Sequence, residues 1–118
     1  MVRMGRLTTH ILDTAGGIPA AGVDIRLYSL NDGRELKAAA VTNEDGRSEH
    51  PLLMDELLVT GEYELEFDIG NYFHARGIEL DDPAFLDIVV IRFSMRAEQK
   101  YHVPLLVSPW SYSTYRGS

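Results

Sequence analysis

The sequence contains no cysteine, so disulfide bonds, thiolate metal ligands and cysteine nucleophiles are excluded. Long apolar segments are also missing: the longest aliphatic run, Ile88 to Ile91, is far shorter than the roughly 20 residues that a membrane-spanning helix needs. An excess of positive charge is missing too, because 11 Lys and Arg stand against 18 Asp and Glu, giving a formal net charge of −7. Nucleic acids and anionic membranes select basic surfaces, so we expect neither as a partner. No apolar stretch follows Arg3 and Arg6, so we expect no secretory signal and a cytoplasmic protein.

Hydrophobic residues recur with a period of two, which is typical of strands with one buried and one solvated face. The clearest case is the segment 62–68, where Tyr63, Leu65 and Phe67 alternate with acidic residues. The same alternation occurs in three further segments: 23–28, 91–96 and 101–107. Pro104 interrupts the last of these, which predicts a sheet edge or a bulge there.

The length of 118 residues suits one domain, and we expect residues 1–118 to form it. The Asn31-Asp32-Gly33 sequence predicts a hairpin between residues 23–29 and 35–42. A helix is favoured only near Gly70 to Gly77, as one or two turns. Seven or eight short strands in this length predict an all-β antiparallel sandwich or barrel.

Familiar catalytic motifs are absent from the sequence, and the four histidines have no closely spaced partners that would indicate a metal site. By alternation His10 shares a face with Thr8 and Leu12. Taken alone, His10 and His102 are more often half-buried strand histidines than functional ones, and Arg47 is most often a solvated turn residue. For the other two histidines, His50 and His74, we expect surface positions.

The acidic residues are unevenly distributed along the chain. Residues 1–50 carry seven Asp or Glu, residues 51–100 carry eleven, and residues 101–118 carry none. The acid-free end, from Trp110 to Ser118, is rich in aromatic and hydroxyl side chains that favour a strand. We expect a last strand that runs to the final residue, and its position at a sheet edge, in a subunit contact or in a site stays open at this point.

Four segments between about residue 6 and residue 118 stand out: Leu7 to Thr14, Thr42 to Arg47, Tyr101 to Pro109, and the ending Tyr115 to Ser118. In their order and spacing they resemble the transthyretin-like family, and in particular its 5-hydroxyisourate hydrolase branch. The resemblance implies two four-stranded sheets packed as a sandwich, one short helix, and a homotetramer with sites at a dimer–dimer interface. It also implies hydrolysis of 5-hydroxyisourate to 2-oxo-4-hydroxy-4-carboxy-5-ureidoimidazoline in urate degradation, without a metal or an organic cofactor.

The resemblance also assigns residues. His10, Arg47 and His102 match the family's catalytic basic residues, and Tyr115, Arg116, Gly117 and Ser118 match its active-site tetrapeptide. Lys100 departs from the family pattern, which commonly has a histidine there, and this leaves the role of that position open.

Hydrolytic ring opening requires a base for water, a stabiliser for the oxyanion and a proton for the leaving nitrogen. A neutral imidazole suits the first role, and His102 is our first choice with His10 second. Arg47 would hold the carbonyl oxygens, and Ser118 would orient a histidine or the water through its hydroxyl or terminal carboxylate. Tyr115, Arg116 and Gly117 are expected to bind substrate, with positioning of the terminal strand as the alternative role for Arg116. We expect His10, Arg47, His102 and Arg116 to converge in a small cationic cleft.

Two other functions compete with hydrolysis. One is a transthyretin-like carrier that holds a small ligand without catalysis. The other is a β-sandwich interaction module, which leaves the acid-free ending unexplained.

Overall fold

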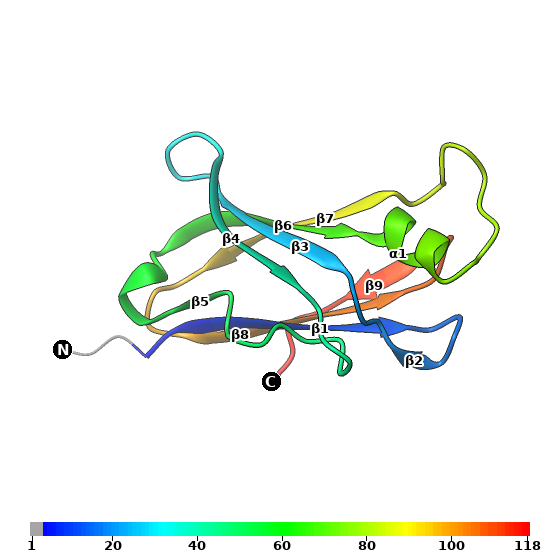
Figure 1. Cartoon of the computed structure of the whole chain (residues 1–118). Helices are drawn as coiled ribbons and strands as arrows, with labels where there is room; N and C mark the ends of the chain where they lie inside the picture. The colour runs from blue at the N-terminus through cyan, green and yellow to red at the C-terminus, as the bar shows by residue number, and fades with distance from the viewer. Residues whose placement is uncertain (1–3) are drawn as a thin grey trace.

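Two β-sheets pack face to face in the computed structural model, which describes residues 4–118 (Figure 1). The first sheet has the order β2-β1-β8-β9, with β5 also pairing with β1, and the second has the order β4-β3-β6-β7. The strands of the first sheet are β1 (Arg6–Asp13), β2 (Ile18–Pro19), β5 (Leu53–Met54), β8 (Lys100–Val107) and β9 (Tyr112–Thr114). Those of the second are β3 (Asp24–Ser29), β4 (Glu35–Val41), β6 (Gly61–Asp68) and β7 (Ile88–Met95). The expected all-β sandwich is confirmed.

The alternating sequence pattern builds the core between the sheets. In β6 the aromatic and aliphatic residues Tyr63, Leu65 and Phe67 are buried, while the acidic residues between them lie outside. In β1 the side chains of Leu7 and Ile11 are completely buried in the same core. Burying such side chains stabilises the fold by about 1.5–3 kcal/mol each. The other face of β1 and of β6 therefore lies outside the core.

Two details of the sandwich differ from the sequence-based expectation. The first sheet has five strands, because the chain turns after β1 and adds the two-residue β2 along the end of β1. The pairing is also not wholly antiparallel, since β1 and β8 run parallel over their full lengths. Alternation predicts which face a residue occupies but not the direction of its neighbouring strand. The predicted hairpin is confirmed as the antiparallel pair β3 and β4.

The helix α1 (Ile69–Ala75) follows β6 directly, close to the predicted segment, and lies at one end of the sandwich (Figure 1). Its residue Tyr72 donates a hydrogen bond of 2.8 Å to the buried carboxylate of Asp13 at the end of β1. Asp13 also accepts from the backbone N–H of Gly16 at 2.8 Å and pairs with Arg76 at 3.5 Å. The helix is thereby tied to the first sheet. No helix within residues 4–118 is long and apolar enough to cross a membrane.

Candidate active site

Polar side chains lie together on the outer face of the first sheet, where β1 and β8 run side by side. The register places Thr8 opposite His102 and His10 opposite Pro104. Thr8, His10 and His102 are half-buried, whereas the residues that alternate with them point into the core. The predicted grouping of His10 with Thr8 and Leu12 is therefore confirmed. Because the strands are parallel, residues 94 positions apart become direct neighbours.

Arg47 reaches this face from a tight turn whose geometry is set by Asn43. The side-chain oxygen of Asn43 accepts hydrogen bonds from the backbone N–H groups of Asp45 at 2.9 Å and Arg47 at 3.2 Å. The backbone N–H of Asn43 donates to the Arg47 carbonyl at 2.8 Å. An asparagine side chain that mimics a backbone turn in this way is a common device in loops. The turn consequently holds the backbone of Arg47 in one conformation.

Gly46 brings this turn against the edge of β1. Its carbonyl accepts from the backbone N–H of Ile11 at 2.8 Å, and the next residue, Arg47, forms an isolated antiparallel bridge with His10. Gly46 has φ +76°, and a Cβ at this position would collide with the Ile11 carbonyl. Both the left-handed backbone and the close approach require glycine. Arg47 is thereby placed beside His10.

The surroundings of His102 perturb its titration. Its Nδ1 atom lies 2.8 Å from the hydroxyl oxygen of Thr8. Burial lowers the pKa of His102 from its ordinary value of 6.5, and the charges of Arg47 and His10 lower it further. All three causes disfavour the imidazolium form. His102 is therefore neutral at pH 7, as a general base must be.

After β9 the last residues of the chain, 115–118, return to His102; we call this segment the tail. The regular strand ends at Thr114, so the expectation of a strand running to the final residue is wrong. Pairing resumes at Gly117, whose N–H donates to the His102 carbonyl at 2.7 Å in the register already set by Leu105 and Thr114. The interruption falls opposite Pro104, which has no N–H to donate. The Pro104 carbonyl accepts instead from the Thr114 hydroxyl at 2.7 Å.

This also corrects the prediction drawn from Pro104. The strand β8 lies inside the sheet, between β1 and β9, and its unchanged register with the tail shows that Pro104 forms no bulge. The proline instead marks the end of the regular β8–β9 pairing. The Thr114 hydroxyl satisfies the Pro104 carbonyl there, while the proline has no N–H that would need a partner on the tail.

Gly117 packs directly on the ring of His102. A Cβ at Gly117 would lie 2.8 Å from Cδ2 of His102 and 3.4 Å from its Cγ. The next residue, Ser118, lines a hollow of about 260 Å³ together with His102, Thr8 and two cationic residues, Arg6 and Lys100. The last two residues of the tail therefore complete one wall of the histidine site.

Arg6 and Lys100 lie directly opposite each other at the start of β1 and β8. Both are exposed, and within residues 4–118 neither takes part in an ion pair. Like charges across neighbouring strands are unfavourable unless an anion lies nearby. The rim of the hollow is therefore electropositive, although the whole protein is acidic.

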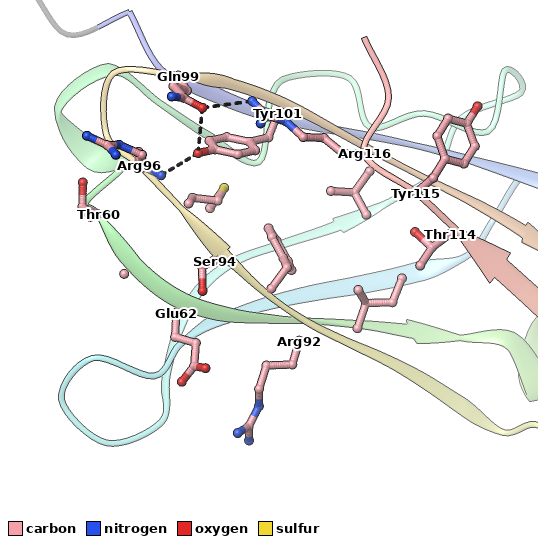
Figure 2. A pocket seen from close by; sticks show the side chains of 15 residues that line it. Thr60, Glu62, Arg92, Ser94, Arg96, Gln99, Tyr101, Thr114, Tyr115 and Arg116 are labelled. Carbon is pink, nitrogen blue, oxygen red and sulfur yellow. Dashed lines mark hydrogen bonds between the residues drawn. The ribbon is translucent and has the colours of Figure 1, made fainter.

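Arg116 points away from this cluster. Its guanidinium lies 4.4 Å above the ring centre of Tyr101 and donates to the Gln99 side chain at 3.1 Å and the Lys100 carbonyl at 3.2 Å. Figure 2 shows Arg116 extended toward Gln99, with Tyr115 pointing in another direction. Tyr115 and Arg116 instead border a different hollow of about 740 Å³, which lies between β7 and the strands β8 and β9.

The structure thus places Gly117 and Ser118 against His102, and the backbone of Arg47 against that of His10. Arg47 lines a neighbouring hollow that shares Arg6 and Thr8 with the hollow at His102. Arg116 does not enter the expected cationic cleft. Tyr115 also lies outside it. Sequence reasoning missed Thr8 and Asn43 as supporting residues. Asn43 had a usable signal in its turn sequence, whereas the contact of Thr8 depends on a parallel register that alternation does not reveal. His50 and His74 are exposed, as expected.

The chemistry of the cluster is that of acid–base catalysis on a carbonyl compound. A neutral imidazole stands beside a permanent cation, and residues 4–118 gather no group of three His, Asp or Glu side chains able to hold a metal ion. Fold and site together define a β-sandwich protein with a histidine–arginine site on one outer sheet face. The chain belongs to the HIUase/Transthyretin family, whose model matches residues 7–117.

Individual relatives agree with this assignment. The chain is 56% identical over 117 residues to a 5-hydroxyisourate hydrolase of Ralstonia nicotianae, covering 98% of this chain and 100% of the relative. The crystal structure of an (S)-allantoin synthase superimposes with a TM-score of 0.93 at 44% identity; the match covers 98% of this chain but only 44% of that longer protein. Sea bream transthyretin in complex with thyroxine superimposes with a TM-score of 0.84 at 28% identity, covering 95% of this chain and 94% of the other.

Proposed function

We propose that this protein is a hydrolase that opens the ring of 5-hydroxyisourate in urate degradation, giving 2-oxo-4-hydroxy-4-carboxy-5-ureidoimidazoline. The observation that carries the proposal is the neutral imidazole of His102 beside Arg47 and His10, enclosed on one side by Gly117 and Ser118. Family membership and the name of the Ralstonia relative support the same activity.

In the proposed reaction His102 removes a proton from water through Nε2, the ring nitrogen that faces away from Thr8. The resulting hydroxide attacks the ring carbonyl carbon, and the electron pair of the carbonyl becomes an oxyanion. When the oxyanion collapses, the carbon–nitrogen bond breaks and the imidazolium of His102 returns its proton to the leaving nitrogen. The new carboxyl group ionises, so the product gains a negative charge. A positioned general base of this kind contributes on the order of 10²–10⁴-fold.

The neighbouring residues take the remaining roles in the proposal. Arg47 holds the substrate oxygens and stabilises the oxyanion with a charge that does not titrate. The backbone of His10 forms a bridge with that of Arg47, and His10 is the second candidate for the base. Ser118 orients the water or the substrate from the tail, and Gly117 positions the tail on His102. Tyr115 and Arg116 act on the substrate only indirectly, by holding the tail in place.

The proposed activity is tested by generating 5-hydroxyisourate from urate with urate oxidase and following its absorbance. We expect this protein to speed the decay well beyond the spontaneous rate. His102→Gln and Arg47→Gln are each expected to remove most of the acceleration. His74→Gln, an exposed change on α1, serves as the matched control and should retain it. Decay at the spontaneous rate with the wild-type protein would sink the proposal.

The alternative is a carrier without catalysis, favoured by the likeness to thyroxine-bound sea bream transthyretin. A carrier function does not explain why the backbone of Arg47 bridges to His10 or why Gly117 packs on His102. Tight binding of thyroxine together with no effect on 5-hydroxyisourate would favour the carrier. We expect the reverse pattern.

We also propose that residues 1–118 act as one domain, that the protein is a homotetramer and that it works in the cytoplasm. Exposed aromatic residues on the tail side of the first sheet support self-association: Trp110, Tyr112 and Tyr115 are 66%, 44% and 61% exposed. Analytical ultracentrifugation should give a mass four times that of the chain, and a monomer at micromolar concentration would contradict the tetramer.

The location is tested by fluorescence microscopy of cells that make this protein fused to a fluorescent protein.

A further inference from the structure

We propose that Thr8 is a positioning residue that holds His102 in the tautomer with the proton on Nδ1, so that Nε2 is free to accept a proton from water. This proposal rests on the proposed hydrolytic function for its catalytic meaning. The arrangement of protons that it describes is a property of the resting protein and stands apart from turnover.

The Thr8 hydroxyl has a single proton to donate. Its oxygen lies 2.8 Å from Nδ1 of His102 and 3.4 Å from the carbonyl oxygen of Tyr101. A carbonyl oxygen can only accept a hydrogen bond, so that second contact needs the hydroxyl proton. The contact to His102 can then form only if Nδ1 carries a hydrogen and donates it. One proton arrangement therefore satisfies both contacts, and it leaves Nε2 unprotonated.

The surroundings of the ring keep this arrangement in place. Gly117 lies against Cδ2 and Cγ on one side, and its N–H binds the carbonyl of the same histidine. The charged and titratable groups that face His102 come from three elements: His10 and Arg6 on β1, Lys100 on β8, and Arg47 on the turn beside β1. None of these side chains carries a negative charge that would draw the proton away from Nδ1. The terminal carboxylate of Ser118 lines the same hollow, together with the two cations Arg6 and Lys100.

The consequence is that proton transfer uses Nε2 alone. Nδ1 carries a hydrogen both in neutral His102 and in its imidazolium form, so Thr8 accepts the same hydrogen bond before and after the base takes its proton. No tautomer exchange is needed during a catalytic cycle. This is the orienting role that a third group plays for the base of a hydrolase, supplied here by a neutral hydroxyl in place of a carboxylate.

The test compares three variants of the full chain. Thr8→Val keeps the shape of the side chain and removes the oxygen, while Thr8→Ser keeps the oxygen. Thr14→Val is the matched control, because the Thr14 hydroxyl also bonds across to β8, to the Val107 carbonyl at 3.1 Å, but far from His102. Long-range proton–nitrogen NMR spectra of the imidazole identify which ring nitrogen carries the hydrogen, and the decay of 5-hydroxyisourate gives kcat and KM.

We expect the wild-type protein, Thr8→Ser and Thr14→Val to show His102 with the hydrogen on Nδ1. Thr8→Val should lose that preference, and its kcat should fall about 10-fold or more while KM changes by less than about 2-fold. A hydrogen on Nε2 in the wild-type spectrum would overturn the proposal, as would an unchanged tautomer and kcat in Thr8→Val. The spectrum decides the question even if the wild-type protein has no hydrolase activity, so the two proposals fail independently.

Discussion

Replacing Gly117 with alanine adds one methyl group at the closest contact between the tail and His102. The new carbon would lie 2.8 Å from Cδ2 of the ring and 3.3 Å from the His102 carbonyl oxygen. Ordinary carbon–carbon contacts begin near 3.5 Å, so the ring and the tail must separate by about 0.7 Å. The carbonyl oxygen belongs to the backbone of β8, which is paired on its other side with β1 and cannot easily move. The imidazole and the tail must therefore give way.

A displacement of this size at the proposed base is costly for catalysis. A misplacement of about 1 Å in an active site can cost on the order of 10²-fold in rate. We therefore expect Gly117→Ala to lower kcat for 5-hydroxyisourate by about 10- to 100-fold. Stability should change by less than about 1 kcal/mol, because the tail is near the surface and Gly117 does not use a left-handed backbone. Urea unfolding and the absorbance assay measure the two quantities separately.

Gly33→Ala is the control, and it should show the opposite pattern. Gly33 lies in the hairpin between β3 and β4 with φ +74° and no atom within 4 Å of an added Cβ. Alanine there strains the backbone by about 1–2 kcal/mol but leaves His102 untouched. We expect reduced stability with an unchanged kcat. If Gly117→Ala retained the wild-type kcat, the inference that the tail positions His102 would be wrong.

Three further predictions concern titration and the tail. Because burial and the Arg47 charge lower the pKa of His102, the midpoint of the decline in activity toward acid pH should lie below 6.5. In Arg47→Gln this midpoint should move to a higher pH, as a pH–rate profile would show. Burial and the bond to a carboxylate raise the pKa of Tyr72 to about 12, so the folded state holds this proton more tightly than the unfolded state. Stability should therefore be lost as pH rises from about 10 to 12, and urea unfolding of Tyr72→Phe should lack this loss while showing about 1–3 kcal/mol less stability at pH 8. Arg116→Met should free the tail, and faster hydrogen exchange of the Gly117 amide would report it; unchanged exchange would mean that the guanidinium contacts do not hold the tail.

The sequence pattern predicted the faces of the strands well. Tyr63, Leu65 and Phe67 are buried as their alternation with acidic residues requires, and His10 lies on the same face as Thr8. These predictions succeed because hydrophobic burial dominates the free energy of each strand locally. The strand direction of β1 and β8 could not be predicted in this way, since parallel and antiparallel neighbours bury the same residues.

The site was predictable in its residues more than in its geometry. Resemblance to the family singled out His10, Arg47 and His102, but the expectation for Arg116 shows its limit. Arg116 neighbours Gly117 in sequence, yet in an extended tail successive side chains point to opposite sides. With Gly117 facing the ring of His102, Arg116 has to lie over Tyr101 on the other side. Its role follows from the register of the tail, which Pro104 and Thr114 determine.

In β1 and β8 one face packs in the core and the other forms the site, so substitutions in these strands fall into two groups. We expect substitutions at inward positions such as Leu7 or Leu105 to act mainly on folding, and those at outward positions such as Thr8 or His102 to act mainly on the site. A lineage can therefore exchange one activity for another through a few outward residues and a short tail, with little penalty in folding. The close superposition on both an (S)-allantoin synthase and a thyroxine-bound transthyretin is what such divergence on an unchanged scaffold produces.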